Sequence, residues 1–142
     1  MGFLNALTGG GAVVQMTLQK QRYQAGESVF AWINVTANEN LNADGIVLHL
    51  FCVEQTQPQH CSRCNMNTNG QSETVFSNEI RLSGPVQLWQ GQAAQFQGSI
   101  QIPQGLPPTF MGRHASCKWF LEARVSMFGN DPDTKMEIQV FS

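Results

Sequence analysis

The sequence predicts an all-β fold, an antiparallel immunoglobulin-like β-sandwich of seven to eight strands, and two observations support this prediction. The first is a long alternation in residues 115–127, where every second residue is apolar. Successive side chains of a strand point to opposite faces, so this stretch is expected to bury one face and expose the other. The second is that shorter alternating stretches recur between Gly, Pro and Asn residues, while no segment beyond residues 2–7 has the apolar period of a helix.

The same alternation predicts the other strands. Residues 46–53 are apolar on both faces except at His49, which is typical of a central strand covered on both sides or of a strand at a sheet junction. Residues 130–133 read Asn-Asp-Pro-Asp, a turn that joins the last two strands into a hairpin. In chain order the predicted strands are residues 12–18, 27–36, 46–53, 74–82, 95–102, 115–127 and 136–140.

Residues 1–11 consist of an apolar segment followed by the hinge Gly9-Gly10-Gly11. Two hypotheses are open for the apolar side chains Phe3, Leu4 and Leu7. They form an exposed patch together with Phe30 and Trp32 and mark a partner surface, or residues 2–7 fold back as a short helix that covers this patch.

Length and charge limit the class of protein. A chain of 142 residues fits a single domain, residues 1–142, with a core of its own. The formal net charge is −2 and the eight Lys and Arg residues are scattered, so nucleic-acid binding is not expected. No apolar run approaches the roughly 18 residues that span a bilayer, and no basic segment precedes the apolar start as in a signal peptide. We expect a cytoplasmic protein without a transmembrane segment; peripheral membrane association stays open.

The order of motifs resembles that of a known family. Met1-Gly2-Phe3-Leu4 leads through the Gly-rich segment into Ala12-Val13-Val14, and Tyr23-Gln24-Ala25-Gly26-Glu27 precedes the next strand. Later, Ile102-Pro103 and Leu106-Pro107-Pro108-Thr109 precede the long strand. This arrangement is similar to the amino-terminal lobe of the arrestin-like superfamily, in particular the bacterial sporulation-control, SpoOM-like, proteins.

That resemblance implies a β-sandwich used as a protein-interaction scaffold, with no catalysis. Two features depart from it. Arrestin-like proteins generally carry two such lobes, whereas this sequence has one. The adjacent Lys pair that senses phosphate in visual and β-arrestins has no counterpart in residues 12–18, so receptor binding is not carried over.

The sharpest local motif is His60-Cys61-Ser62-Arg63-Cys64, inside a polar loop of residues 57–72. Cys61 and Cys64 have the spacing of the first half of a zinc site. The remaining ligands would have to be recruited through the fold from His60, Cys52, His49 or His114, or from a second copy. Metal ligation, a reducible Cys61–Cys64 disulfide and plain loop thiols all stay open; zinc is the only cofactor that the sequence suggests.

Other reactive residues favour structural interpretations. Cys52 and Cys117 have apolar neighbours and are predicted to be buried free thiols. His49 is expected to be a hydrogen-bonded core or interface histidine, and Glu122 to form cross-strand charge pairs beside Lys118 and Arg124. No Gly-x-Ser-x-Gly motif is present, and we predict that the protein is not an enzyme.

The three tryptophans complete the prediction. Trp119 falls on the core face of the long strand, Trp32 shares a face with Phe30, and Trp89 lies in an edge or loop segment, residues 84–91. Phe30, Trp32 and Trp89 are therefore the candidate partner surface.

The function predicted from the sequence is a non-enzymatic protein–protein interaction or scaffold module. It would bind through sheet edges, the loop of residues 57–72 or the aromatic patch, and a homodimer could stand in for the missing second lobe. Two alternatives are a metal- or redox-responsive protein that uses Cys61 and Cys64, and a carbohydrate-binding module that uses the tryptophans.

Overall fold

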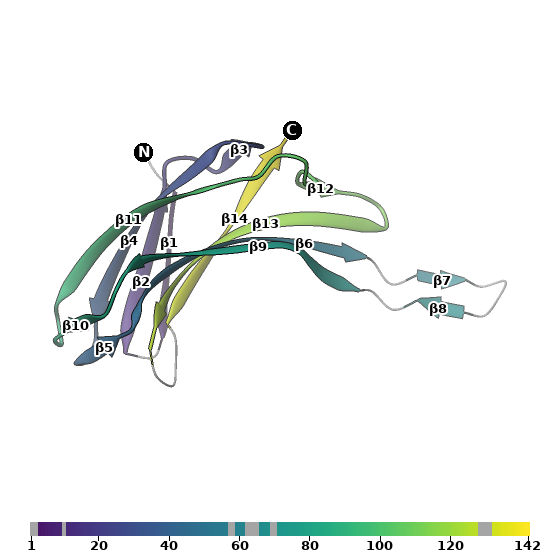
Figure 1. Cartoon of the computed structure of the whole chain (residues 1–142). Coiled ribbons are helices and arrows are strands. Elements are labelled where there is room, and N and C mark those ends of the chain that lie inside the picture. The colour runs from purple at the N-terminus through teal and green to yellow at the C-terminus, as the bar shows by residue number, and fades with distance from the viewer. Residues whose placement is uncertain (1–2, 10, 57–58, 62–65, 69–70, 128–131) are drawn as a thin grey trace.

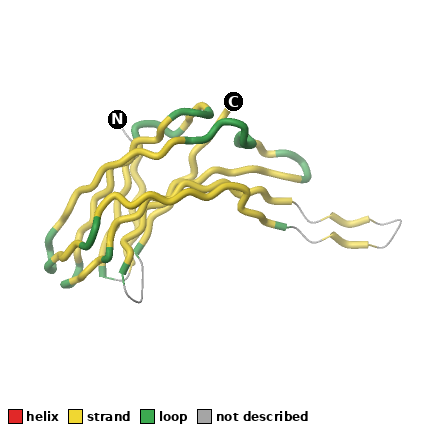
Figure 2. The backbone as a smooth tube through the Cα atoms, in the orientation of Figure 1, coloured by secondary structure: helices red, strands yellow, loops and turns green. Residues whose placement is uncertain are grey.

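The computed structural model of the chain describes residues 3–9, 11–56, 59–61, 66–68, 71–127 and 132–142 (Figure 1). These residues form strands and loops without a helix (Figure 2). The strands are β1 (Phe3–Gly9), β2 (Ala12–Leu18), β3 (Arg22–Gln24), β4 (Ser28–Ala37), β5 (Leu41–Ala43), β6 (Gly45–Thr56), β7 (Gln59–Cys61), β8 (Met66–Thr68), β9 (Ser72–Ser83), β10 (Val86–Leu88), β11 (Ala93–Gln101), β12 (Phe110–Met111), β13 (Ala115–Ser126) and β14 (Asp133–Phe141).

Two main sheets build the fold. The smaller has the order β1-β2-β4-β11, and the larger the order β3-β14-β13-β6-β9, with β12 added to β13. Two-stranded pairs β10–β5 and β7–β8 complete the topology, and in Figure 1 the β7–β8 pair lies beyond the ends of β6 and β9. Every pair is antiparallel except β3–β14, which is parallel. The predicted all-β, antiparallel class is confirmed.

The alternation of apolar residues explains why the two sheets pack. In β2 every second residue from Ala12 to Leu18 is buried, and β13 buries the alternate residues from Cys117 to Val125. These side chains join those of β4, β6 and β14 in one hydrophobic cluster. Trp119 is the largest member and is fully buried, as predicted, and its indole Nε1 donates a hydrogen bond to the carbonyl oxygen of Pro107 at 3.0 Å.

The seven strands predicted from alternation all exist, with boundaries that differ by up to three residues; they are β2, β4, β6, β9, β11, β13 and β14. The predicted central position of residues 46–53 is also confirmed, since β6 lies between β13 and β9. The turn predicted at residues 130–133 falls mainly outside the described residues.

The helix considered for residues 2–7 is wrong. Phe3–Gly9 is a strand that pairs antiparallel with β2 along its whole length, from Phe3 opposite Leu18 to Gly9 opposite Ala12. Gly9 and Gly11 consequently belong to the reversal of a hairpin rather than to a hinge. Gly11 has a φ of 93°, a left-handed conformation that glycine adopts without a steric cost.

Within the part of the chain that the structure describes, no helix is long and apolar enough to cross a membrane.

Candidate functional site

An aromatic groove lies on the outer face of the smaller sheet. Because Val29, Ala31 and Ile33 point into the core, Phe30 and Trp32 of β4 point outward. Phe30 is 51% exposed. A hollow of about 280 Å³ runs along these side chains, and it is lined by Phe30, Ala31, Trp32, Gln97, Gly98 and Ser99. None of these residues is charged. Two of the three predicted partner residues thus share one uncharged groove between β4 and β11.

β11 forms an edge of the same sheet, since it pairs with β4 and with no other described strand. Its nine residues contain neither a charge nor a proline. Ile102, just beyond β11, donates its N–H to the carbonyl of Glu27, and the Ala37 N–H bonds the carbonyl of Gln92. Hydrogen-bonded and non-hydrogen-bonded pairs alternate in an antiparallel ladder, so even-numbered residues of β11 direct their backbone groups toward β4. The N–H and C=O groups of Gln95, Gln97 and Ser99 therefore point to the open edge.

Trp89 does not belong to this groove. It is 54% exposed and follows β10, in a turn where its N–H binds the Gln92 side chain at 2.9 Å. The neighbouring Gln90 N–H binds the Asn40 Oδ1 at 2.8 Å. The lining of the Phe30–Trp32 groove does not include Trp89, so the three predicted residues do not make one continuous surface.

The sequence prediction missed a second exposed apolar group, formed by Phe110, Met111 and Phe141. Met111 is 79% exposed. They line a groove of about 320 Å³ together with Arg22, Lys118 and Glu137, among others. The Arg22 guanidinium lies 5.7 Å from the centre of the Phe141 ring, within the range of a cation–π interaction. This groove carries charges of both signs, unlike the groove at Phe30.

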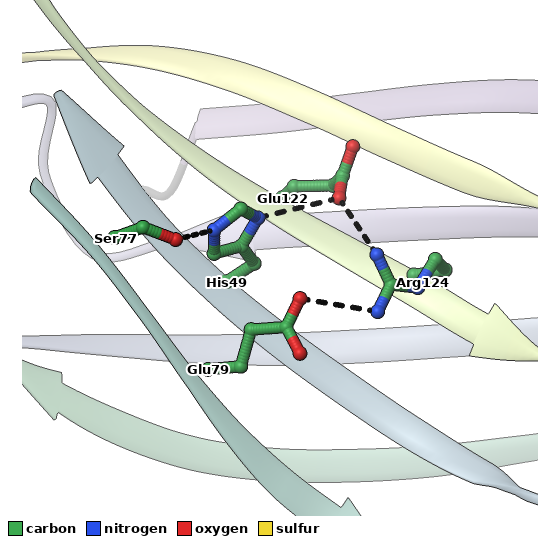
Figure 3. Close-up of polar contacts among 5 residues, drawn as sticks. All are labelled: His49, Ser77, Glu79, Glu122 and Arg124. Atoms are coloured by element: carbon green, nitrogen blue, oxygen red, sulfur yellow. Dashed lines mark hydrogen bonds and ion pairs between the residues drawn. The ribbon is translucent and has the colours of Figure 1, made fainter. Parts of the chain in front are cut away.

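A polar network occupies the outer face of the larger sheet (Figure 3). His49 of β6 lies between Glu79 of β9 and Glu122 of β13, which are its register partners. The His49 Nε2 is 2.6 Å from the Ser77 Oγ, and its Nδ1 is 3.7 Å from the Glu122 Oε1. Arg124 bridges the two carboxylates, at 3.2 Å from Glu79 and 3.6 Å from Glu122. The predicted hydrogen bond of His49 is thus observed. The cross-strand charge contacts in this row are Glu122 with His49 and Arg124 with Glu79, whereas Glu122 and Arg124 lie on the same strand.

Burial changes the proton affinity of this network. Desolvation is the main cause that lowers the pKa of His49; the Glu79 carboxylate opposes it, and the Arg124 guanidinium adds a smaller lowering. Desolvation also raises the pKa of Glu122, and the nearby Asp133 carboxyl raises it further against the effects of Arg124 and Lys135. Both groups are therefore shifted toward their neutral forms.

Ser77, His49 and Glu122 lie next to one another in space in the arrangement Ser–His–carboxylate, which is also that of a catalytic triad. Sequence spacing could not reveal this arrangement because the three residues lie on three different strands. Two features are unfavourable for nucleophilic catalysis. The 3.7 Å separation of His49 Nδ1 from Glu122 is too long for the hydrogen bond that fixes the imidazole tautomer. The raised pKa of Glu122 also weakens the negative charge that would stabilise an imidazolium. The aromatic side chains Phe51 and Phe120 stack beside the network, which suits a packed sheet surface.

The structure separates two of the residues considered for zinc, Cys52 and His49. Cys52 points into the core and is buried, whereas His49 lies on the opposite, outer face of β6. The two side chains therefore cannot bind the same metal ion. Among the described residues, no group of three or more His, Cys, Asp or Glu side chains could hold a metal. Cys61 is in β7, but its side chain and the whole of Cys64 lie outside the described residues. Cys52 and Cys117 are buried free thiols, as predicted.

Comparisons with known proteins agree with this fold. The model of the family described as SpoOM protein matches residues 1–135. The crystal structure of Spo0M, a sporulation control protein from Bacillus subtilis, superposes with a TM-score of 0.69 at 20% sequence identity. The match covers 94% of this chain and 50% of that protein, so the chain spans about half its length. A search of curated proteins gave no match.

Proposed function

The chain belongs to the SpoOM protein family, and from this premise we propose that it is a non-enzymatic regulatory module that binds an extended segment of a partner protein along β11. The observation that carries the proposal is the uncharged open edge of β11 beside the groove of Phe30 and Trp32. An edge strand offers backbone hydrogen bonds to an added strand, and neighbouring pockets select its side chains.

The chemistry of the surface indicates the partner. Gln95, Gln97 and Ser99 offer outward N–H and C=O groups, which supply affinity without selecting a sequence. Selection comes from the groove, whose aromatic and amide lining favours apolar side chains and disfavours desolvated charges. The expected partner segment is therefore extended, uncharged, and apolar on the face that meets Phe30.

A second copy of the chain fits this surface less well. Two β11 strands could pair edge to edge, but the outer-face side chains of the added strand would be Gln95, Gln97 and Ser99. These polar groups would leave Phe30 and Trp32 uncovered. A different protein with apolar side chains would cover them, so we favour a heterologous partner over the homodimer.

The test is selection of binding peptides from a random displayed library on the immobilised full chain. Gln97→Pro removes an N–H that points to the open edge and costs no bond to β4. Phe30→Ser removes the aromatic wall of the groove. We expect selected peptides to be uncharged and apolar at alternate positions, and each variant to weaken them at least about tenfold, or about 1.4 kcal/mol.

Trp89→Ser is the matched control, because it removes an equally exposed aromatic side chain outside the groove. Binding should survive this change. Peptides that bind Gln97→Pro and Phe30→Ser normally, peptides that depend on Trp89 instead, or a library that yields no binder would each contradict the proposed function.

A further inference from the structure

The core of the sandwich holds two thiols in contact. The Sγ atoms of Cys52 on β6 and Cys117 on β13 are 3.0 Å apart, and both side chains are fully buried. Their register partners are Trp119 and Glu54, so the two cysteines sit diagonally across an antiparallel pair. Diagonal neighbours come close only when their side chains lean toward each other, as these do.

From this geometry we propose that Cys52 and Cys117 form a modification site, an oxidisable dithiol that closes to a disulfide when a peroxide reaches the core. A disulfide has an S–S length of about 2.05 Å, so the sulfurs must approach by roughly 1 Å. The bond would link β6 to β13, two interior strands of the larger sheet, across 65 positions of the sequence.

The two thiols differ in their roles. Burial raises the pKa of both thiols, so reaction requires that the site opens and that one of them loses its proton. Cys117 lies against the loop that carries Pro107, at 3.8 Å from its carbonyl oxygen, so it is the first thiol that peroxide meets. The Cys117 sulfur attacks one peroxide oxygen, the O–O bond breaks, and the departing hydroxide leaves as water with the thiol proton; the Cys52 sulfur then attacks the sulfenic sulfur and displaces its hydroxyl group, which leaves with the Cys52 proton as a second water. Two electrons pass from the thiols to hydrogen peroxide, which is reduced to two molecules of water.

The route to the thiols runs through a loop. Residues 103–109 connect β11 to β12 and lie against Cys117, whose Sγ is 3.8 Å from the Pro107 carbonyl oxygen. The same carbonyl accepts the hydrogen bond from Trp119, which ties the loop to β13. A loop held by few such bonds opens more readily than the paired strands beneath it. Oxidation is therefore expected to be limited by this opening and to accelerate when the Trp119 bond is lost.

The test uses the full chain with Cys61→Ser and Cys64→Ser, so that only the core thiols can react. The reduced protein is exposed to hydrogen peroxide, unfolded, and treated with N-ethylmaleimide. We expect the intact mass to fall by about 2 Da, the two hydrogens lost, with no alkylation and with a linked peptide containing Cys52 and Cys117. A thiol reductant should restore two alkylations, and Trp119→Phe should speed the loss of free thiol several-fold.

Two controls keep the result interpretable. In the same background, Cys52→Ala and Cys117→Ala each leave one core thiol, which must remain available for one alkylation or appear as a sulfinic acid. Loss of the fluorescence of buried Trp119 on oxidation, absent in both variants, provides a readout in the folded state. Two free thiols after prolonged peroxide treatment of the folded chain, or equal oxidation of Cys52 and Cys117 to separate sulfinic acids, would overturn the proposal. Neither result depends on whether peptides bind at β11.

Discussion

His49 illustrates how much a single side chain depends on its place in a sheet. In the sequence it interrupts an apolar run, which predicted a hydrogen-bonded role but could not name the partners. Those partners, Ser77, Glu79 and Glu122, come from two other strands that pair with β6. The chemistry of His49 is therefore a property of strand register, which a short-range sequence pattern does not contain.

The lowered pKa of His49 predicts how stability depends on pH. The unfolded chain takes up the proton at about pH 6.5, whereas the folded chain takes it up only at lower pH. The contribution of neutral His49 is present above about pH 6.5 and is lost as pH falls through the folded pKa. Glu122 acts in the opposite direction, since its raised pKa favours the folded state at lower pH.

Comparison with His49→Gln isolates the histidine. We expect the free energy of unfolding of the wild-type chain, measured in urea, to fall more than that of the variant between about pH 7.5 and pH 5.5. The difference should stay below about 1 kcal/mol, because the ring is partly exposed to solvent. Parallel pH profiles for the two proteins would show that His49 does not titrate differently on folding.

At the scale of elements, alternation predicted most of the long strands because they have one buried and one exposed face, as in β2, β4, β13 and β14, whereas β6 was predicted from a run that is apolar on both faces. The short strands β3, β5, β7, β8, β10 and β12 have two or three residues each, too few to display a period. β1 was misread because residues 2–7 carry apolar residues at both helical and strand spacings, and only pairing with β2 decides between a helix and a strand.

The candidate surface was predicted in part. Phe30 and Trp32 followed from strand parity, whereas the open edge of β11 depends on sheet order.

The contact between β11 and β9 explains the glycine at position 98. Gly98 faces the core side of β11, and a Cβ added there would collide with the Leu82 Cδ2 of β9. Gly98→Ala should lower the free energy of unfolding by about 1–3 kcal/mol, the usual cost of overpacking. Gly84→Ala is the control, because no atom lies within 4 Å of its added Cβ, and it should change stability by less than about 0.5 kcal/mol. Equal urea midpoints for the two variants would mean that Leu82 adapts freely.

At the scale of the whole molecule, the two sheets share one core while the chain matches only half of the Bacillus protein. A sandwich of this size can be stable without a second lobe, since a chain of about 150 residues buries some 68–70% of its unfolded surface.

Native mass spectrometry of the reduced chain, with and without a chelator, tests the stoichiometry. Cys52 and His49 lie on opposite sides of β6 and cannot both complete one site with Cys61 and Cys64. Since we also favour a heterologous partner over a homodimer, we expect one chain without bound zinc. A dimer that carries zinc and loses it with the chelator would instead support the metal-responsive alternative.

The parallel pair β3–β14 has a consequence for biosynthesis. It joins residues 22–24 to residues 139–141, so the larger sheet cannot be completed until β14 has left the ribosome. Until then β13 lacks one of its two neighbours, and the apolar faces of β2 and β4 have only part of the surface they pack on in the native state. Folding of this lobe is therefore expected to be completed only after β14 has been synthesised and has left the ribosome.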